Sequence, residues 1–358
     1  MMTKTKIQLL SIVAGAMLAA CTGKTSDNAY VLTATVSSEF DGSTAFLVNF
    51  DTGEKVDSVT VENGTAKFAG NVSSPLMARI VIDGNRFGNV VLEDGEIVVA
   101  DRKATGTPLN EMNNKVADHL KELGQKYKKI PQDSTSGEAR RLIDAEYEAY
   151  TDSVFNANID NVIGYGLFLD KAYYMNLEEL RDVLEAHPSL KGYKRVAKLL
   201  EAAENKEKTS VGNKFVDFTI TNDSVQQSLS DYVGRGKPVL VDFWASWCGP
   251  CIKETKVLKE ILSEYGSQGL EVLGVAVWDE PENTLGAIEK HKLHWPQILN
   301  AQAVPTDIYG ISGIPCIILF GPDGTILSRD KQGDQLRADV KAYFDGTLNA
   351  PSDSLAVK

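Results

Sequence analysis

Residues 29–105 consist of short runs rich in Val, Ile, Thr and Phe that are separated by turn formers, a pattern typical of β-strands. Turn-forming pairs such as Asp41-Gly42 and Asn63-Gly64 separate the apolar runs, because Asn, Asp and Gly tolerate positive φ. The block contains no His and no Cys, so we interpret it as a binding or positioning module. The pattern predicts an all-β sandwich or open barrel over residues 29–109. The expected strands are Tyr30–Val36, Ala45–Phe50, Ser58–Val61, Ala66–Ala69, Ala78–Ile82, Val90–Leu92 and Ile97–Ala100.

Over residues 110–208 the apolar period changes to three and four, which predicts helices with one apolar face each. Asn176, with Glu179 three residues later, is a typical start for one of these helices. The Glu204–Lys208 run is interpreted as a solvated helix end and a linker. Five tyrosines either pack between helices, the commoner case, or line a groove; they are Tyr147, Tyr150, Tyr165, Tyr173 and Tyr174.

Residues 211–347 alternate strand-like and helix-like segments, which predicts an α/β domain with helices on both sides of a sheet. The run Val239–Phe243 is apolar except for Asp242, as in a strand that is covered on both faces. The expected strands are Phe215–Ile220, Pro238–Trp244, Leu270–Val277, Cys316–Phe320 and Thr325–Ser328, and the expected helices follow Gly249 and cover Pro281–Lys292 and Asp334–Phe344. Residues 348–358 are interpreted as a C-terminal tail.

The first 20 residues have the form of an export signal, with a basic start and an apolar stretch from Ile7 to Leu18. The run Leu18-Ala19-Ala20-Cys21 resembles a bacterial lipobox, which implies cleavage after residue 20 and a lipid anchor on Cys21. Residues 21–28 then form a polar tether. An ordinary secretory signal with an incidental Cys21 is the alternative. In either case we expect an exported protein, and we favour a periplasm-facing lipoprotein of the cell envelope, in either membrane.

Composition narrows the function classes. The 358 residues are 43% hydrophobic and 24% charged, which is ordinary globular usage and excludes collagen-like, disordered and multi-span membrane proteins. The net charge of −12 gives no basic field that would attract phosphates, so nucleic-acid binding is disfavoured.

The strongest chemical signal is the run from Trp247 to Cys251, where a buried strand leads directly into a helix. Two cysteines three residues apart on a helical turn can form a disulfide. Cys248 lies at the expected helix N-terminus, where free N–H groups stabilise a thiolate, so we expect it to be an exposed nucleophile. Cys251, one turn inside, can attack a mixed disulfide formed on Cys248. Pro250 fits the first helical turn, and Trp247 is expected to shield the sulfurs.

These residues, in the string Asp242-Phe243-Trp244-Ala245-Ser246-Trp247-Cys248-Gly249-Pro250-Cys251, resemble the thioredoxin superfamily in its TlpA/ResA-like branch of membrane-tethered thiol-disulfide oxidoreductases. The resemblance implies a thioredoxin fold over 211–347 and a buried Asp242 that exchanges a proton with Cys251. The alternative for Asp242 is a carboxylate that is merely hydrogen-bonded at a strand end. A zinc site is the alternative for the cysteines, but no second pair of ligands at suitable spacing is present.

The segment Gly313-Ile314-Pro315 matches the family's second element. The resemblance implies a cis proline at Pro315 against the disulfide and a substrate-binding backbone at Ile314. Trp247, Gly249 and Pro250 complete the expected substrate side. Cys316 departs from the usual pattern: it is either a third redox thiol or a small apolar filler of a buried strand, and buried free cysteine favours the filler.

The front of the chain, ending in Gly106-Thr107-Pro108-Leu109-Asn110, resembles the domain of unknown function that precedes thioredoxin-like domains in envelope lipoproteins. We therefore expect an α/β thioredoxin fold at the C-terminus, preceded by the all-β domain and a helical segment. The expected activity is disulfide exchange with exported proteins, in the reducing direction, without metal and with no cofactor beyond the Cys248–Cys251 disulfide. The expected partners also include an inner-membrane or periplasmic thiol donor. The protein is expected to be attached to a membrane by its lipid anchor.

Two other functions are considered. The peroxidase pattern PxxxTxxC would require Pro and Thr where the chain has Val241 and Ala245, so this alternative is disfavoured. The other is a client-binding envelope module in which the β-domain and the tyrosine-bearing helices hold a partner, while the cysteines act only as a redox switch.

Overall fold

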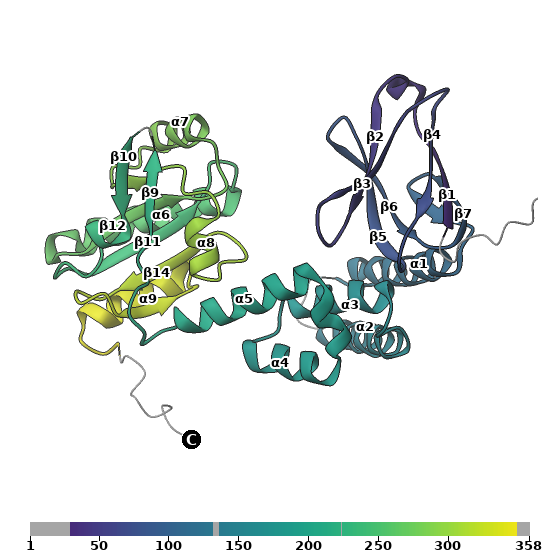
Figure 1. Ribbon diagram of the computed structural model, residues 1–358. Helices are drawn as coiled ribbons and strands as arrows, with labels where there is room; N and C mark the ends of the chain where they lie inside the picture. The colour runs from purple at the N-terminus through teal and green to yellow at the C-terminus, as the bar shows by residue number, and fades with distance from the viewer. Residues whose placement is uncertain (1–28, 132–135, 223, 349–358) are drawn as a thin grey trace, which may run out of the picture. The chain divides into compact units, whose positions relative to one another are not determined.

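A computed structural model describes residues 29–131, 136–222 and 224–348, and the chain forms two compact units that divide between Gly164 and Tyr165 (Figure 1). This division groups the elements differently from the three blocks expected from the sequence. The signal segment 1–20, the tether 21–28 with Cys21, and the tail from residue 349 lie outside the described residues. Within the described ranges, no helix combines the length and the apolar character that a bilayer crossing needs.

The first unit begins with two four-stranded sheets that pack face to face, in the orders β4-β1-β7-β8 and β3-β2-β5-β6. One apolar core fills the space between them, with Leu32, Phe68 and Ile80 almost fully buried. The predicted sandwich is therefore confirmed, and each predicted strand lies within or overlaps an observed one. The strands are β1 Ala29–Thr35, β2 Thr44–Asn49, β3 Lys55–Thr60, β4 Thr65–Asn71, β5 Leu76–Ile82, β6 Asn85–Leu92, β7 Gly95–Ala100 and β8 Lys103–Thr105.

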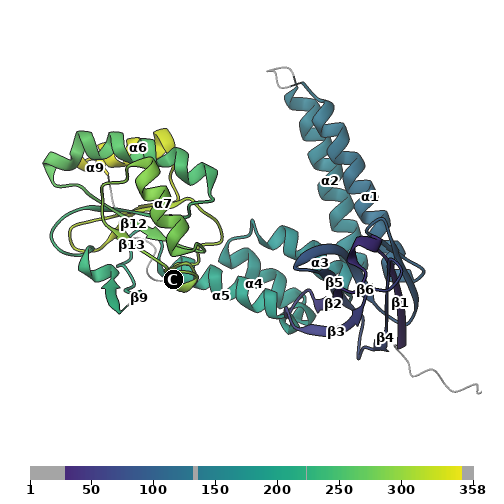
Figure 2. The ribbon, with the colours of Figure 1, turned by 90° about the horizontal axis from the view of Figure 1, so that it is seen from above.

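Helices α1 (Pro108–Lys129) and α2 (Gly137–Ala157) complete this unit and lie side by side (Figure 2). The start of α1 is attached to the sandwich, because the Asn110 side chain accepts from the Val91 N–H at 2.9 Å and donates to the Val91 carbonyl at 2.7 Å. Glu93 accepts hydrogen bonds from the first N–H groups of the same helix. The sheet thus supplies partners for helix-terminal groups that would otherwise be unpaired.

Helix α3 (Val162–Ala172) runs across the division into the second unit, which continues with α4 (Leu177–Ala186), the 3-10 helix η2 (Pro188–Gly192) and α5 (Lys194–Lys208). The predicted capping box of α4 is confirmed: the Asn176 side chain accepts from the Glu179 N–H, and Glu179 accepts from the Asn176 N–H, both at 2.9 Å. The Glu204–Lys208 run, predicted to be a helix end and a linker, is the last turn of α5, so its helix-end part is confirmed. Its Asn205 donates to the Asp307 carbonyl at 3.0 Å, so this helix end is attached to the following fold.

The rest of the second unit is built on a five-stranded sheet in the order β13-β12-β11-β14-β15. Strands β11, β12 and β13 are parallel, and β14 and β15 are antiparallel to their neighbours. Helices α6, α7 and α9 contribute to the core on one face, while α8 and the β9–β10 hairpin lie on the other (Figure 2). The elements are β9 Thr219–Asn222, β10 Val225–Ser228, η3 Leu229–Asp231, β11 Val239–Trp244, α6 Gly249–Tyr265, η4 Gly266–Gln268, β12 Glu271–Ala276, α7 Pro281–His291, β13 Gln297–Ile298, α8 Val304–Ile308, β14 Cys316–Phe320, β15 Ile326–Arg329 and α9 Gly333–Phe344.

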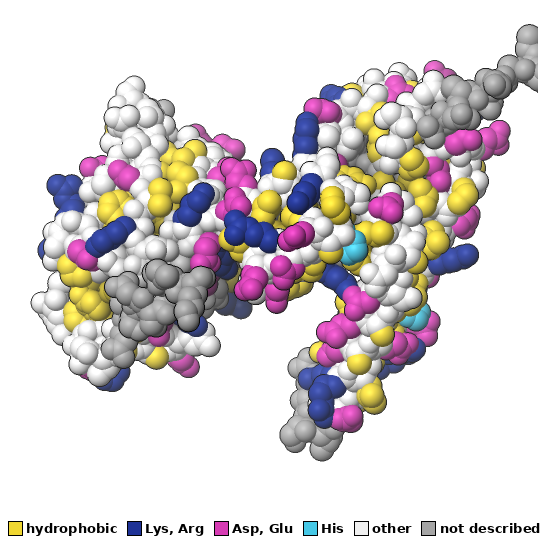
Figure 3. All heavy atoms as spheres, turned by 60° about the horizontal axis from the view of Figure 1, so that its bottom comes forward, with side chains coloured by type: hydrophobic (Ala, Val, Ile, Leu, Met, Phe, Trp, Pro, Cys, Tyr) yellow, Lys and Arg dark blue, Asp and Glu magenta, His cyan; other side chains and the backbone are white. Residues whose placement is uncertain are grey.

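This is the thioredoxin-like fold that the sequence predicts. On the face drawn in Figure 3, Lys and Arg side chains are scattered among Asp and Glu and do not gather into one basic patch.

Candidate active site

Cys248 and Cys251 are joined by a disulfide at the start of α6, with their Cα atoms 5.2 Å apart. Cys248 is the N-cap of the helix and Pro250 lies in its first turn, as predicted. The Cys251 N–H points at the Cys248 sulfur, with 3.1 Å between nitrogen and sulfur. On reduction, this donor and the positive end of α6 favour the thiolate of Cys248 over the thiol.

The sulfur pair is less exposed than the sequence suggested. We expected an exposed Cys248, but only 4% of this residue is accessible, and Cys251 is fully buried. Cys248 belongs to a core cluster against which Ile314 packs, and the Ile314 carbonyl oxygen lies 3.8 Å from the Cys248 sulfur. Cys248 is nevertheless the more accessible of the two, so the predicted order, an outer sulfur and an inner one, is retained.

Asp242 lies on the same face of β11 as the cysteines. Successive side chains of a strand point to opposite faces. Leu240 and Trp244, two residues to either side of Asp242, belong to the core cluster that contains both cysteines, whereas Val241 and Phe243 belong to the opposite cluster. The carboxyl group is therefore directed toward the α6 side of the sheet.

Burial makes this carboxyl group a weak acid. Asp242 is only 1% exposed, and one of its oxygens has no hydrogen-bond partner among the described residues. Burial, with a smaller contribution from the negative charge of Glu254, raises the pKa of Asp242 to about 8. A carboxyl group with such a pKa is a stronger base than an ordinary carboxylate, so its ionised form can accept a proton and release it again near neutral pH. The alternative of a carboxylate satisfied by hydrogen bonds is disfavoured by the unpartnered oxygen.

Glu254 was not singled out from the sequence. It lies on α6, one turn after Cys251, and its carboxylate accepts the Gly333 N–H at 3.1 and 3.2 Å. This bond links α6 to the start of α9 and keeps a negative charge near Asp242. A Glu in an amphipathic helix carries no signal in the sequence that distinguishes it from a solvated residue.

The Ile314–Pro315 peptide bond is cis, and the Ile314 carbonyl lies beside the disulfide, 3.8 Å from the Cys248 sulfur. The Pro315 carbonyl accepts from the Gln332 side chain at 3.2 Å, which ties the loop to the start of α9. The strand that follows pairs with β11 so that Cys316 lies opposite Phe243. The register thus brings Ile314 and Pro315, which are 63 or more residues from the cysteines in sequence, to the end of β11 where α6 begins.

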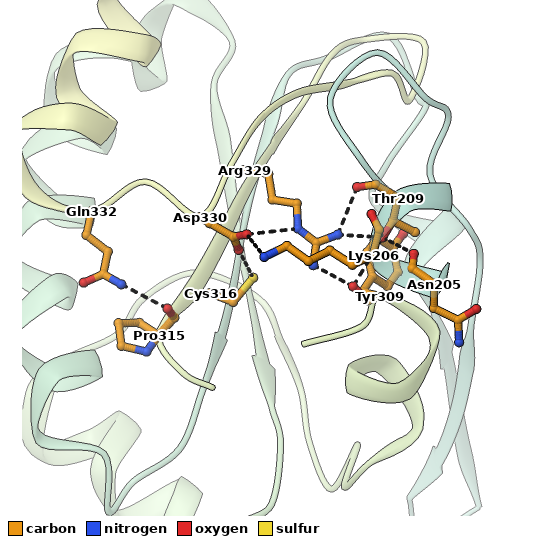
Figure 4. A network of polar contacts seen from close by, with 9 residues as sticks. All are labelled: Asn205, Lys206, Thr209, Tyr309, Pro315, Cys316, Arg329, Asp330 and Gln332. Atoms are coloured by element: carbon orange, nitrogen blue, oxygen red, sulfur yellow. Dashed lines mark hydrogen bonds and ion pairs between the residues drawn. The ribbon is translucent and has the colours of Figure 1, made fainter. Parts of the chain in front are cut away.

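Cys316 is a buried thiol held in a polar contact. It is 2% exposed, and its sulfur donates to an Asp330 oxygen at 3.2 Å (Figure 4). Burial and the negative charge of Asp330 raise the pKa of the Cys316 thiol well above its usual value. A thiol that stays protonated is a poor nucleophile, so the structure favours the filler interpretation over a third redox thiol.

The loop before Cys248 is fixed by the segment that follows β12, a contact the sequence did not predict. Asp279 is 5% exposed and accepts from the Ser246 N–H at 2.7 Å, from the Ser246 hydroxyl at 2.9 Å and from the Thr284 hydroxyl at 2.8 Å. Beside it, the Trp247 indole N–H donates to the Trp278 carbonyl at 2.9 Å. Trp247 itself is 61% exposed, so it lies beside the sulfurs at the surface.

Residues 211–329 match the family model described as the AhpC/TSA family, and residues 30–113 match a domain of unknown function, DUF4369. The thiol-disulfide oxidoreductase ResA of Geobacillus thermodenitrificans is 30% identical over 142 residues, which cover 39% of this chain and 80% of that protein. ResA of Bacillus subtilis is 28% identical over 123 residues, which cover 34% of this chain and 68% of that protein.

Among solved structures, the thioredoxin domain of a thiol-disulfide oxidoreductase from Bacteroides vulgatus is 31% identical, with a TM-score of 0.33, and the match covers 39% of this chain and 99% of that one. A thiol:disulfide interchange protein from a Bacteroides species is 29% identical, with a TM-score of 0.34, over 41% of this chain and 96% of that one. The family of this chain follows from its sequence similarity to ResA. The chain belongs to the ResA-like family of thioredoxin-fold thiol-disulfide oxidoreductases, and it carries a DUF4369 domain in front of the thioredoxin fold.

Proposed function

We propose that this chain is a disulfide reductase of the cell envelope that uses Cys248 and Cys251 to reduce disulfides in exported proteins. One arrangement supports the proposal most directly: the two sulfurs lie at the N-terminus of α6, above a buried Asp242 whose pKa is raised to about 8. This is the combination that two-step disulfide exchange needs, because one sulfur must be a thiolate and the other must lose a proton later.

The exchange begins with both cysteines reduced. The Cys248 thiolate attacks one sulfur of the substrate disulfide, so that a mixed disulfide forms and the other substrate sulfur leaves as a thiolate. Cys251 then attacks the Cys248 sulfur, the Cys248–Cys251 disulfide closes, and the second substrate sulfur leaves. The substrate gains two electrons and two protons, and the protein is left oxidised.

Asp242 has the role of a proton acceptor in the second step. Cys251 is fully buried, so it has little access to bulk water for deprotonation. An ionised Asp242 on the same face of the sheet can take the thiol proton of Cys251 and release it after the protein disulfide has formed. No cofactor other than the disulfide itself enters this scheme.

Direction and location are part of the proposal. The Gly249-Pro250 pair between the cysteines resembles thioredoxin, whose potential is about −270 mV, rather than the oxidant DsbA at about −120 mV. The export signal and Cys21 support a lipoprotein that faces the periplasm. An inner-membrane or periplasmic thiol donor has to return two electrons to Cys248–Cys251 after each cycle.

The test is turnover of a disulfide-containing model protein by the full-length chain with a dithiol as electron donor. We expect Cys248→Ser to reduce turnover to background, because no sulfur is left to attack. Cys251→Ser should accumulate a covalent mixed disulfide on Cys248, visible as a mass increase that a reductant removes. The same variant, expressed in its native envelope, would identify the exported proteins that become bound.

Cys316→Ser is the matched control, because it removes a third thiol that is buried and one residue from Pro315. We expect its turnover to stay within a few fold of the unmodified protein. A loss as large as that of Cys248→Ser would give Cys316 a catalytic role. If both Cys248 and Cys251 resist alkylation after treatment with reductant, the proposed reaction does not occur.

A further inference from the structure

A groove runs along the second unit from the cis-proline loop to the helices that precede the thioredoxin fold. It consists of two adjoining hollows of about 340 and 470 Å³, which share Tyr173, Lys206, Gly310, Ser312, Arg329 and Asp330 in their walls. The smaller hollow is lined by the loop from Ser312 to Pro315, in which the Ile314 carbonyl oxygen lies 3.8 Å from the Cys248 sulfur. The larger hollow extends away from it toward α4 and α5.

The loop end of the groove offers backbone groups that have no backbone partner. Among the residues that the structure describes, this holds for the N–H and C=O groups of Ser312, Gly313 and Ile314. Ser312 and Gly313 are also exposed. Such a segment can pair with an extended polypeptide, because the main-chain groups of a second strand supply the missing partners.

The far end of the groove is apolar. Its walls include Met175, Leu177, Leu180 and Leu199, of which Leu180 is almost fully buried. The charges at the floor, Lys206 on α5 and Asp330 after β15, are paired with each other at 3.1 Å (Figure 4). Arg329 also forms an ion pair with Asp330, at 3.5 Å, and donates to the Thr209 and Tyr309 carbonyls at 3.0 and 2.6 Å. The floor is thus built from internally paired groups, and the space above it suits an apolar side chain better than a charged one.

Two exposed tyrosines connect the two ends. Tyr173 is 55% exposed, and its hydroxyl lies only 3.4 Å from the position that a Cβ atom would take on Gly313. Tyr174 is 84% exposed, and its ring meets that of Tyr173 edge to face, with 5.1 Å between centroids. Large aromatic side chains left this exposed beside a cavity are typical of binding surfaces. Tyr165, by contrast, is buried and stacks on Tyr193, as the packing interpretation expected.

From these observations we propose that the larger hollow is a second subsite for the substrate polypeptide, distinct from the backbone at Ile314 that the thioredoxin resemblance already implies. A large apolar or aromatic side chain, several residues from the cysteine that Cys248 attacks, enters the hollow between Tyr174, Leu177 and Leu199. The groove includes the loop whose Ile314 carbonyl oxygen lies 3.8 Å from the Cys248 sulfur, so a substrate segment is the occupant that fits. This inference rests on the proposed function.

The test compares three disulfides reduced by the full-length protein. The first is bis(2-hydroxyethyl) disulfide, which needs only the sulfurs. The second is a peptide with one disulfide and a phenylalanine several residues from the reacting cysteine, and the third is the same peptide with serine in place of that phenylalanine. We expect kcat/KM to favour the phenylalanine peptide over the serine peptide by about tenfold, as an apolar pocket typically does.

The decisive variant is the double substitution Tyr173→Ser and Tyr174→Ser, in which both replaced side chains are exposed. It should reduce the preference to about twofold or less and leave the rate with the small disulfide within about twofold. Tyr127→Ser is the control, because Tyr127 is also exposed, at 42%, but lies on α1 in the other unit. It should leave all three rates unchanged.

The results that would overturn the proposal are distinct. An undiminished phenylalanine preference in the double variant, or an equal fall with all three disulfides, removes the groove from substrate binding. Dimers of the unmodified protein that dissociate in the double variant would assign the groove to a second copy instead. If the unmodified protein reduces none of the three disulfides, the proposed function itself fails.

A second measurement locates the segment directly. A peptide with a photoreactive benzoyl-phenylalanine at the aromatic position is first bound to Cys248 as a mixed disulfide in Cys251→Ser, and then irradiated. We expect crosslinks to residues 172–180 or 199–211. Crosslinks confined to other parts of the chain would contradict the proposal.

Discussion

At the scale of single residues, the active site depends on groups whose charge is set by burial. Asp242 shows this most clearly. Its side chain faces a core cluster, one of its oxygens has no partner among the described residues, and its pKa is raised from 3.8 to about 8. A buried carboxyl group without a full set of partners lowers the free energy of unfolding at any pH that favours its charged form.

The first prediction concerns the pH dependence of that cost. Between pH 3.8 and about 8 the folded protein binds a proton at Asp242 that the unfolded chain releases, so the free energy of unfolding falls as pH rises through this window and levels off above it. At pH 7 the cost is on the order of 4 kcal/mol. Oxidised Asp242→Asn should therefore gain stability over the unmodified protein as pH rises, measured by urea unfolding.

Glu254→Gln provides the matched comparison for this prediction. Glu254 is the smaller cause of the raised pKa of Asp242, so its neutralisation should lower that pKa only in part. The free energy of unfolding should then still fall as pH rises, but it should level off at a lower pH. A stability difference between Asp242→Asn and the unmodified protein that stays constant from pH 4 to pH 9 would show that Asp242 does not titrate as the structure implies.

At the scale of elements, local sequence patterns predicted most of the secondary structure and the position of the cysteines on α6. The elements missed are short or polar: β13 has two residues, α8 has five, and β10 reads Val-Gln-Gln-Ser. Their formation depends on neighbours distant in the chain, which no local period reveals.

One predicted strand is mostly not a strand. We expected Phe215–Ile220, but only the part from Thr219 lies in β9. The Phe215 N–H donates to the Gly324 carbonyl at 2.8 Å, and the Tyr309 hydroxyl both accepts from the Val216 N–H and donates to its carbonyl, at 3.0 and 2.8 Å. A side chain 93 residues away thus replaces the ladder partner, which the apolar pattern could not indicate.

The residues of the candidate site likewise include some that the sequence could identify and some that it could not. The cysteines, Asp242 and Pro315 could be identified because they fall in one compact string and one tripeptide. Asp279 could not, because its role arises from a contact with Ser246, which lies 33 positions away in the sequence. Tyr173 was only one of five tyrosines that either pack between helices or line a groove, and its place beside Gly313, 140 positions away, is a finding of the structure.

The second prediction tests the role of Asp279 as a positioning residue. Its hydrogen bonds to Ser246 join the turn after β12 to the loop that carries Cys248. Asp279→Ala leaves the half-buried Ser246 N–H and the buried Thr284 hydroxyl without this acceptor, so we expect a loss of about 2–3 kcal/mol in unfolding free energy. It should also slow alkylation of reduced Cys248 at pH 7 by about tenfold, because a displaced loop loses the alignment of the sulfur with the start of α6.

Glu282→Ala is the control, since Glu282 lies exposed in the first turn of α7, close to Asp279 in sequence. It should change neither measurement. If Asp279→Ala destabilises the protein but leaves the pH profile and rate of alkylation unchanged, Asp279 supports the fold without positioning the reactive sulfur.

At the scale of the whole molecule, the chain has separate cores for its two units. The sandwich core uses residues between Tyr30 and Ala104, whereas the two core clusters of the thioredoxin fold use residues between Phe218 and Val340. The sandwich cluster shares no side chain with either of these two, and the sulfurs, Asp242 and the cis-proline loop all lie in the second unit. The proposed disulfide exchange therefore depends on the core clusters of the second unit and not on the sandwich core.

The third prediction follows from this separation. Phe68 is 1% exposed in the sandwich core, and Phe68→Ala should cost about 3–5 kcal/mol there by leaving a cavity. Calorimetry should then show one unfolding transition at a lower temperature and a second one unchanged, while reduction of a small disulfide at 25 °C stays within twofold. Phe320→Ala, in the core beneath the sheet of the second unit, should shift the other transition and reduce activity. A single transition that moves with both substitutions would mean that the two units unfold together, and that the sandwich contributes to the stability of the active site.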